Sequence, residues 1–229
     1  MPTTATAHHD RLTPEEARRA LYIDVEGTAN AMPSLLGTLR RGRGERPFVH
    51  WVALDPVLAG AHLRVLTFHD AITNLVLRAE RNDRRIVAWS THELDLVRTL
   101  RDEDPELVTA FEARFVNALS LAKRWRSRCH EGDKPARRRL RDYLELIGYQ
   151  VPDYAPYDVA ADAIRVVTTR LASGRELTPR HVDKWIRLLE HNRYDCAGTR
   201  AICLRAADEI FADEHPDEAP ARPHQPTRA

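Results

Sequence analysis

The chain has few of the residues that mark several common classes of protein. Its 229 residues include three cysteines, Cys129, Cys196 and Cys203, without CxxC spacing. This odd set fits reduced, buried thiols better than a disulfide framework or a structural zinc site. No apolar run is long enough to cross a bilayer, and residues 1–14 lack the pattern of a signal peptide. We therefore expect a cytoplasmic protein with no membrane partner.

An excess of charge of either sign is also absent. The formal net charge is +1 although 30% of the residues are charged, so the whole-chain charge neither demands nor excludes a polyanionic partner. With 43% hydrophobic residues, a chain of this length can bury a substantial core and favours one domain. Residues 1–13 lack periodicity and residues 213–229 are rich in proline and charge. We expect disordered ends around a single folded domain at 14–212.

Hydrophobic periodicity predicts three consecutive strands near the start of this domain. LYIDVE, residues 21–26, alternates apolar and polar residues, and strand-like runs follow at 34–38 and 48–54. The turn RRGRGERP between the last two favours an antiparallel meander. Helical spacing at 70–81, a short buried strand at 85–89 and a further helix at 91–101 come next. This order predicts an α/β fold with a mixed sheet flanked by helices.

The remainder of the domain is predicted to be mainly helical. A last short strand is expected at 115–119, and helices are expected at 134–146, 159–173 and 179–211. Thr178 and Pro179 mark the start of the last helix. We interpret residues 103–178 as a helical insertion in the domain.

Asp24 and Glu26 are the most informative acidic pair. Two residues apart on a strand, their side chains leave the same face with Cα atoms roughly 6.5–7 Å apart, while Leu21, Ile23 and Val25 face the core. Two such carboxylates repel each other and resist desolvation, so they need a cation, which a divalent metal supplies. The alternative is a strand whose polar face meets water, because D-x-E is common by chance.

Asp195, in EHNRYDCAGTRA, is the candidate third ligand. His191 precedes it by four residues on a predicted helix, so the two side chains share a face one turn apart. The small residues that follow Asp195 would let this helix lie close to a sheet. The alternative for His191 is a surface histidine or a satisfied core histidine.

Four segments in order resemble a known family. LYIDVEGTANAMPSLLGTL resembles the first motif of DEDD-type 3′→5′ exonucleases, in which D-x-E-x-T opens the first strand. HNRYDCAGTRAICL is similar to the last motif of bacterial relatives, usually Y-N-x-x-D followed by a small residue. IVAWSTHELDLVRTL and RRRLRDYLELIGYQVP resemble middle segments of the predicted RecB-associated nuclease domains. The resemblance to this ribonuclease H-like superfamily spans roughly residues 20–207, and the order of four weak motifs is more specific than any one of them.

The resemblance implies a ribonuclease H-like fold and two-metal hydrolysis of phosphodiester bonds. Asp24, Glu26, a middle acid and Asp195 would hold two Mg²⁺ or Mn²⁺ ions, about 4 Å apart. His191 would orient or deprotonate the attacking water, although it stands where this family usually has tyrosine.

Two acids compete for the middle position, where the family commonly has aspartate. They are Glu93 and Asp95, and Glu93 is preferred because it lies at the strand-to-helix junction. The alternative for Glu93 is structural: in S-T-H-E, Ser90 would cap the helix and Glu93 would accept a hydrogen bond from the Ser90 backbone amide.

Two basic segments are candidates for binding nucleic acid. The first includes Trp125, whose ring would stack on an unpaired base, and the second contains Arg40, Arg41, Arg43 and Arg46. The alternative for the first is a solvated helix face with Trp125 in the core. The guanidinium groups assigned to phosphates are those of Arg124, Arg126, Arg128, Arg137, Arg138 and Arg139.

These patterns together favour a Mg²⁺- or Mn²⁺-dependent nuclease, with 3′→5′ polarity on single-stranded ends of DNA or RNA implied by the resemblance. The other interpretation is a catalytically weak or inactive nuclease-like module that binds nucleic acid or docks on a helicase or nuclease partner.

Overall fold

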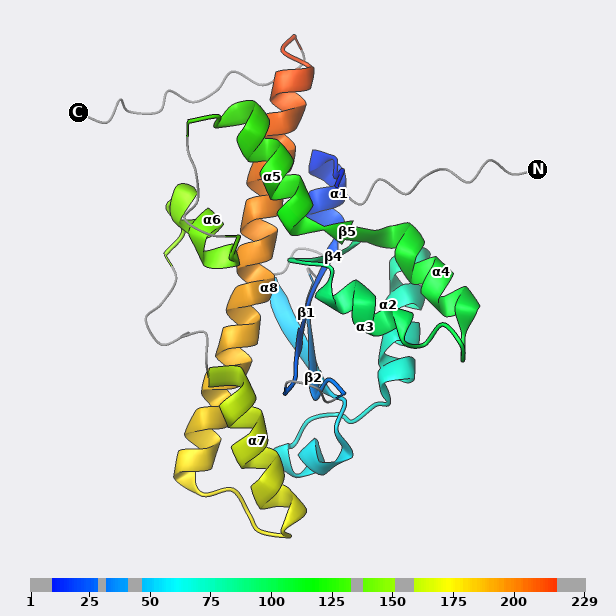
Figure 1. Cartoon of the computed structure of the whole chain (residues 1–229), viewed down its shortest axis with the longest axis vertical. Helices are drawn as coiled ribbons and strands as arrows, with labels where there is room; N and C mark the ends of the chain where they lie inside the picture. The colour runs from blue at the N-terminus through cyan, green and yellow to red at the C-terminus, as the bar shows by residue number, and fades with distance from the viewer. Residues whose placement is uncertain (1–9, 29–31, 41–46, 133–137, 151–158, 218–229) are drawn as a thin grey trace.

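The computed structural model describes residues 10–28, 32–40, 47–132, 138–150 and 159–217. These residues form an α/β fold with one five-stranded mixed sheet flanked by helices (Figure 1), which confirms the expected class. Within the described ranges, none of the helices combines the length and the apolar character needed to cross a membrane.

The sheet has the strand order β3-β2-β1-β4-β5. β1, β2 and β3 form the expected antiparallel meander, and β4 and β5 extend it in parallel from β1. The strands are β1 (Leu21–Glu26), β2 (Leu35–Arg40), β3 (Phe48–Ala53), β4 (Ile86–Ala88) and β5 (Phe115–Asn117).

Helices cover both faces of the sheet. α2, α3 and α4 lie on one face, and the long α8 crosses the other, where it contacts α5, α6 and α7 (Figure 1). The helices are α1 (Pro14–Arg19), the 3-10 helix η1 (Pro56–Ala61), α2 (Phe68–Arg81), α3 (His92–Arg98), α4 (Pro105–Arg114), α5 (Ala118–Cys129), α6 (Leu140–Leu146), α7 (Val159–Ala172) and α8 (Pro179–Glu214).

Alternation along β1 divides the core into two layers. Leu21 and Ile23 pack with α2, α3 and α4, whereas Tyr22 packs with α5, α6 and α8. Asp24 and Glu26 share the face of Tyr22, because side chains two residues apart on a strand point the same way. The carboxylates therefore face α8.

Several boundaries differ from the sequence-based expectation. The stretch 103–178 contains β5, so its first part completes the sheet. α6 begins at Leu140, and residues 134–137 of the helix expected at 134–146 lie outside the described residues. α1 was not expected. Thr13 and Glu16 form its capping box, in which the side chain of each accepts a hydrogen bond from the backbone amide of the other.

Candidate functional site: a cluster of buried carboxylates

Asp24 and Glu26 lie near the carboxyl end of β1, next to the middle of α8. In the sheet Asp24 pairs with Gly37 of β2 and Glu26 pairs with Leu35. Glu26 is only 8% exposed, and its Oε1 atom is buried without a hydrogen-bond partner. The water-exposed polar face considered as an alternative is therefore wrong for Glu26.

Asn192 of α8 holds the carboxylate of Asp24. Its Nδ2 donates to Asp24 Oδ2 at 2.7 Å and to the Asp24 carbonyl oxygen at 3.1 Å. Its Oδ1 accepts a hydrogen bond of 3.1 Å from Trp51 Nε1 on β3. A fully buried amide with both ends bonded fixes the position of α8 over the first three strands.

Gly37 makes this arrangement sterically feasible. It stands between Asp24 and Trp51 in the sheet register, directly beneath the Asn192 amide. A Cβ atom at position 37 would lie 1.7 Å from Asn192 Oδ1, so the Asn192 amide would have to move. The glycine is required for close approach rather than for an unusual backbone angle.

His191 and Asp195 reach the same place from α8. His191 Nε2 lies 3.6 Å from Asp195 Oδ2 and 3.9 Å from Glu26 Oε1. His191 is buried, and its Nδ1 is buried without a hydrogen-bond partner. The one-turn spacing thus brings imidazole and carboxylate together, as the sequence predicts, and places them beside Glu26.

The structure places Glu93, rather than Asp95, beside these groups. Glu93 is 6% exposed and its Oε2 is buried without a partner, while Asp95 is exposed and lies 3.1 Å from Arg98. The capping box considered as the alternative for Glu93 does not form: Thr91 is the N-cap residue and makes no side-chain cap bond. Ser90 Oγ instead accepts from the His92 amide at 3.2 Å.

The carboxylates disfavour one another's ionised forms. Burial raises the pKa of Asp24 well above its usual value, and the charges of Glu26, Asp195 and Glu93 raise it further. Burial raises the pKa of Glu93 to about 7, with Glu26 and Asp195 adding to the effect. Burial also raises the pKa of Asp195 to about 6, against the opposing influence of His191. β1, α3 and α8 therefore assemble a site in which negative charge lacks compensation.

Among the described residues, no group of three or more His, Cys, Asp or Glu side chains is already arranged to hold a metal ion. The oxygen donors are nevertheless the kind that hard divalent cations take. Two of them, Glu26 Oε1 and Glu93 Oε2, are buried with no hydrogen bond. The donor chemistry therefore fits Mg²⁺ or Mn²⁺.

A cavity of about 290 Å³ adjoins His191 and Asp195. Trp89 and Tyr194 contribute aromatic rings to its wall. Three arginines also line it, Arg138, Arg139 and Arg141.

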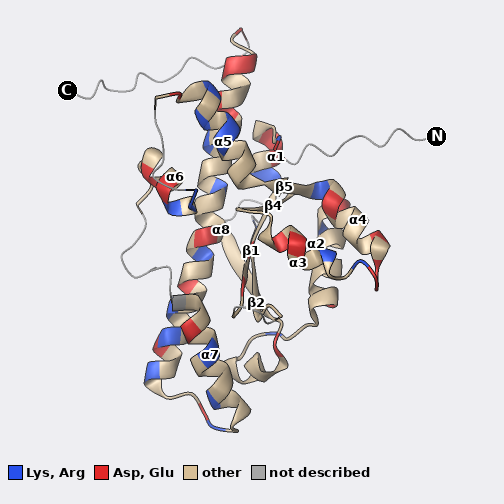
Figure 2. Cartoon of the chain, viewed as in Figure 1, with Lys and Arg blue, Asp and Glu red and all other residues tan. Residues whose placement is uncertain are grey.

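The first basic segment includes arginines of α5, whereas Arg41, Arg43 and Arg46 of the second lie outside the described residues. In α5, Arg124 lies 2.6 Å from Glu214, and Arg128 pairs with Asp213 and Glu214 at the end of α8 (Figure 2). Trp125 is 1% exposed and donates to Glu209 Oε2 at 2.7 Å. Stacking of Trp125 on a base is therefore wrong, because its ring is in the core.

Among the five described arginines of the six assigned to phosphates, only Arg138 and Arg139 line the cavity beside the carboxylates. Arg126 lies half-buried on α5, and Arg137 lies outside the described residues. The site residues missed from the sequence are Asn192, Gly37 and Trp51. For Asn192 a signal exists, the N-x-x-D spacing in HNRYD, which puts it one turn before Asp195.

Comparisons with known proteins found no matching protein-family model, no matching curated protein and no matching solved structure.

Proposed function

We propose that this chain is a metal-dependent nuclease with a ribonuclease H-like fold. The observation that carries the proposal is the convergence of four carboxylates, Asp24, Glu26, Glu93 and Asp195, from three elements that are far apart in the sequence. The antiparallel meander followed by two parallel strands supports the fold that the motif resemblance implies.

A cluster of this kind is costly for a protein that does not use it. Buried ionised carboxylates lose hydration, and neighbouring ones repel. Deleting them would stabilise the fold, so their presence supports a role that requires a cation. The residues that would hold Mg²⁺ or Mn²⁺ are Asp24, Glu26, Glu93 and Asp195. Bound there, two ions would supply an activated water and charge stabilisation at the phosphorus.

The remaining residues have roles that follow from their positions. Asn192 orients Asp24 through the 2.7 Å bond to its Oδ2 atom. His191, next to Glu26 and Asp195, is placed to accept a proton from water at the Nε2 edge. The other ring nitrogen, Nδ1, is buried, whereas His191 lines the cavity beside Asp195.

The cavity beside Asp195 supports nucleic acid as the substrate. Arg138 and Arg139 supply guanidinium groups for phosphate oxygens, and Trp89 and Tyr194 supply rings for a base. Its volume of about 290 Å³ suits one small group rather than a duplex. This supports action on a flexible single-stranded end, and the family resemblance adds the 3′→5′ polarity.

A second candidate is a catalytically weak or inactive module that binds nucleic acid or docks on a partner nuclease or helicase. It is favoured by two departures from the family's pattern, Glu93 in place of the usual aspartate and His191 where the family usually has tyrosine. The two candidates share the cavity and differ in whether the carboxylates hold metal.

The test is digestion of end-labelled single- and double-stranded DNA and RNA with Mn²⁺. Wild type is compared with Asp24→Asn and with Asp95→Asn, which changes an exposed acid that pairs with Arg98. We expect metal-dependent products from wild type and Asp95→Asn, shortened from the 3′ end, and none from Asp24→Asn. Equal inactivity of all three folded proteins, with retained nucleic-acid binding, would favour the second candidate.

A further inference from the structure

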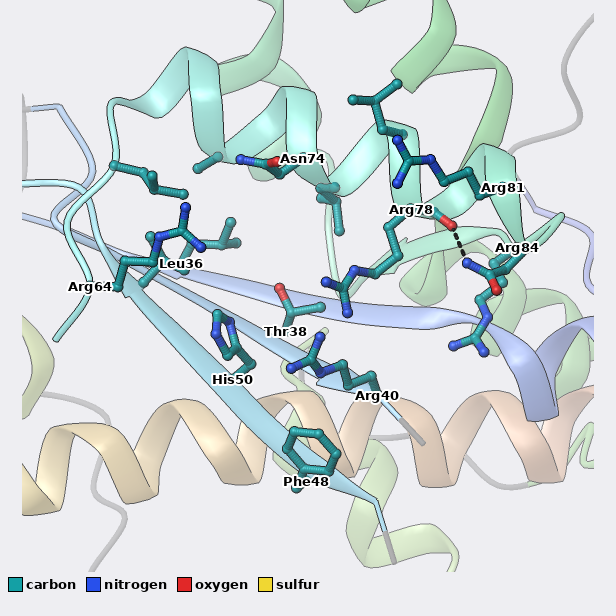
Figure 3. Close-up of a pocket in the computed structure, with 16 residues that line it drawn as sticks. Leu36, Thr38, Arg40, Phe48, His50, Arg64, Asn74, Arg78, Arg81 and Arg84 are labelled. Carbon is teal, nitrogen blue, oxygen red and sulfur yellow. Dashed lines mark hydrogen bonds between the residues drawn. The ribbon is translucent and has the colours of Figure 1, made fainter. Parts of the chain in front are cut away.

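A second cavity, of about 550 Å³, lies on the opposite face of the sheet from the carboxylates. Its floor comes from β2 and β3 and its wall from α2 (Figure 3). The register pairs Leu36 with Val52, Thr38 with His50 and Arg40 with Phe48. Paired residues of neighbouring strands share a face, and this face is the one that carries Leu36 toward α2. The cavity is therefore distinct from the site at Asp24.

The lining of this cavity is strongly basic. The described residues that form it include five arginines and no aspartate or glutamate; the arginines are Arg40, Arg64, Arg78, Arg81 and Arg84. They come from β2, the segment before α2, α2 itself and the turn after it, and Figure 3 shows them distributed along the length of the cavity.

These arginines make no ion pair with any residue in the described part of the chain. The Nε atoms of Arg40 and Arg84 are buried without a hydrogen-bond partner. Several arginines elsewhere in the described residues are paired, as with Arg98 and Arg101 on Glu112. Burial and the nearby charges of Arg19 and Arg78 lower the pKa of Arg84. An anion would satisfy these donors and relieve the repulsion.

The other lining groups suit an organic ligand with polar edges. Arg40 lies over the Phe48 ring, 4.9 Å from its centroid, and Phe48 is 41% exposed. Thr38 and Asn74 add hydrogen-bonding groups, and Leu36 adds an apolar surface. A lining that combines apolar and aromatic side chains with placed polar groups is typical of small-molecule sites.

We propose that this cavity binds a small ligand carrying more than one phosphate group, such as a nucleoside polyphosphate. Several phosphates are needed because the guanidinium groups extend along β2, whose length is about 17–20 Å, and a single phosphate reaches only a few of them. A polynucleotide is disfavoured because the cavity has the volume of a single-molecule site and lies across the sheet from the carboxylates. The assignment does not depend on nuclease activity.

The test is thermal denaturation and calorimetric titration of the full chain with sodium tripolyphosphate and with ATP, in EDTA at about 150 mM salt. Sodium sulfate at matched ionic strength controls for general anion effects. At about 100 times Kd, we expect tripolyphosphate or ATP to raise Tm by roughly 5–10 °C, and sulfate to raise it much less.

Arg84→Gln and Arg78→Gln are the test variants, and Arg165→Gln is the matched control because Arg165 pairs with Asp162 on α7. We expect at least a tenfold loss of affinity in the two test variants and none in the control. Without ligand, the test variants should be at least as stable as wild type, because each removes a repelling charge. Arg78 is exposed, so its variant remains informative if Arg84→Gln fails to fold.

Two results would overturn the proposal. One is equal stabilisation by tripolyphosphate, ATP and sulfate, unchanged by either test variant, which would indicate a general ionic effect. The other is loss of binding to a single-stranded oligonucleotide in the same variants with no binding of tripolyphosphate or ATP, which would assign the cavity to nucleic acid.

Discussion

Replacing Glu93 with glutamine should stabilise the metal-free protein, and only at neutral and alkaline pH. The raised pKa means that the folded protein holds a proton on Glu93 up to about pH 7, whereas the unfolded chain releases it near pH 4.5. Stability of the wild type therefore falls as pH rises through this window and stays low above it. Glutamine has nearly the same shape as glutamate and carries no charge, so the variant avoids this loss of stability at high pH.

The magnitude follows from the two pKa values. A rise from 4.5 to about 7 corresponds to roughly 3 kcal/mol at pH 8, and to less than about 1 kcal/mol at pH 5. For a chain of this length the gain at pH 8 corresponds to an increase in Tm of about 6–12 °C. The assay is thermal and urea denaturation in EDTA at pH 5 and pH 8.

Glu112→Gln is the matched control, and its Tm at pH 8 should change in the opposite direction. Burial alone would raise the pKa of Glu112, but hydrogen bonds from Arg98 and Arg101 outweigh it and lower the pKa. The charge of Glu112 is therefore stabilising, and its loss should lower Tm at pH 8. A Glu93→Gln protein that is less stable than wild type at pH 8, or equally stabilised at pH 5 and pH 8, would refute the interpretation of Glu93 as a repelled carboxylate.

Three further predictions concern the packing around the site and its substrate. Asn192→Ala should lower the free energy of unfolding by about 1–3 kcal/mol, measured by urea denaturation, because Asp24 and Trp51 each lose a hydrogen-bond partner; an unchanged value would contradict the bond network. Gly37→Ala should cost about 1–3 kcal/mol in wild type and much less in Asn192→Ala, because the clash is with the Asn192 amide; strictly additive losses would contradict this. Arg138→Ala together with Arg139→Ala should weaken binding of a single-stranded oligonucleotide and reduce its salt dependence, by about 0.7 in log–log slope for each phosphate that the protein no longer neutralises. Fluorescence anisotropy measures this, and Arg128→Ala, which removes an arginine paired with Asp213 and Glu214, should leave the slope unchanged.

Much of the fold was predictable because the sheet depends on short-range patterns. Period-two alternation in LYIDVE predicts that Asp24 and Glu26 share a face opposite Leu21 and Ile23, and the core layers confirm it. The meander and the later parallel strands followed from the order of periodic segments. α1 was missed although its TPEE start is a capping-box pattern, because the helix has only 6 residues and too little periodicity to detect.

The site was predictable only in part, because its connections are long-range. The spacing of His191 and Asp195 on one helix face is a local property and is confirmed. The contact of Asn192 with Asp24 joins residues 168 positions apart, and no local pattern predicts it. The sequence S-T-H-E permitted a capping box at Glu93, but the tertiary burial of this side chain beside Glu26 and Asp195 took precedence.

The part of the first basic segment that lies in α5 shows the same limit of sequence patterns. Its charges predicted a phosphate-binding surface, but charge patterns along the chain do not reveal that α8 brings Asp213 and Glu214 to Arg128. Trp125 was equally ambiguous until its burial was known.

Mn²⁺ binding tests most directly whether the buried carboxylates form one cation site. Calorimetric titration of Mn²⁺ at pH 8 should show saturable binding to wild type and to the Asp95→Asn control, and loss of at least one site in folded Asp24→Asn and Asp195→Asn. Binding that is identical in all four proteins, or absent from wild type with and without a single-stranded oligonucleotide, would contradict a metal-dependent nuclease at this site.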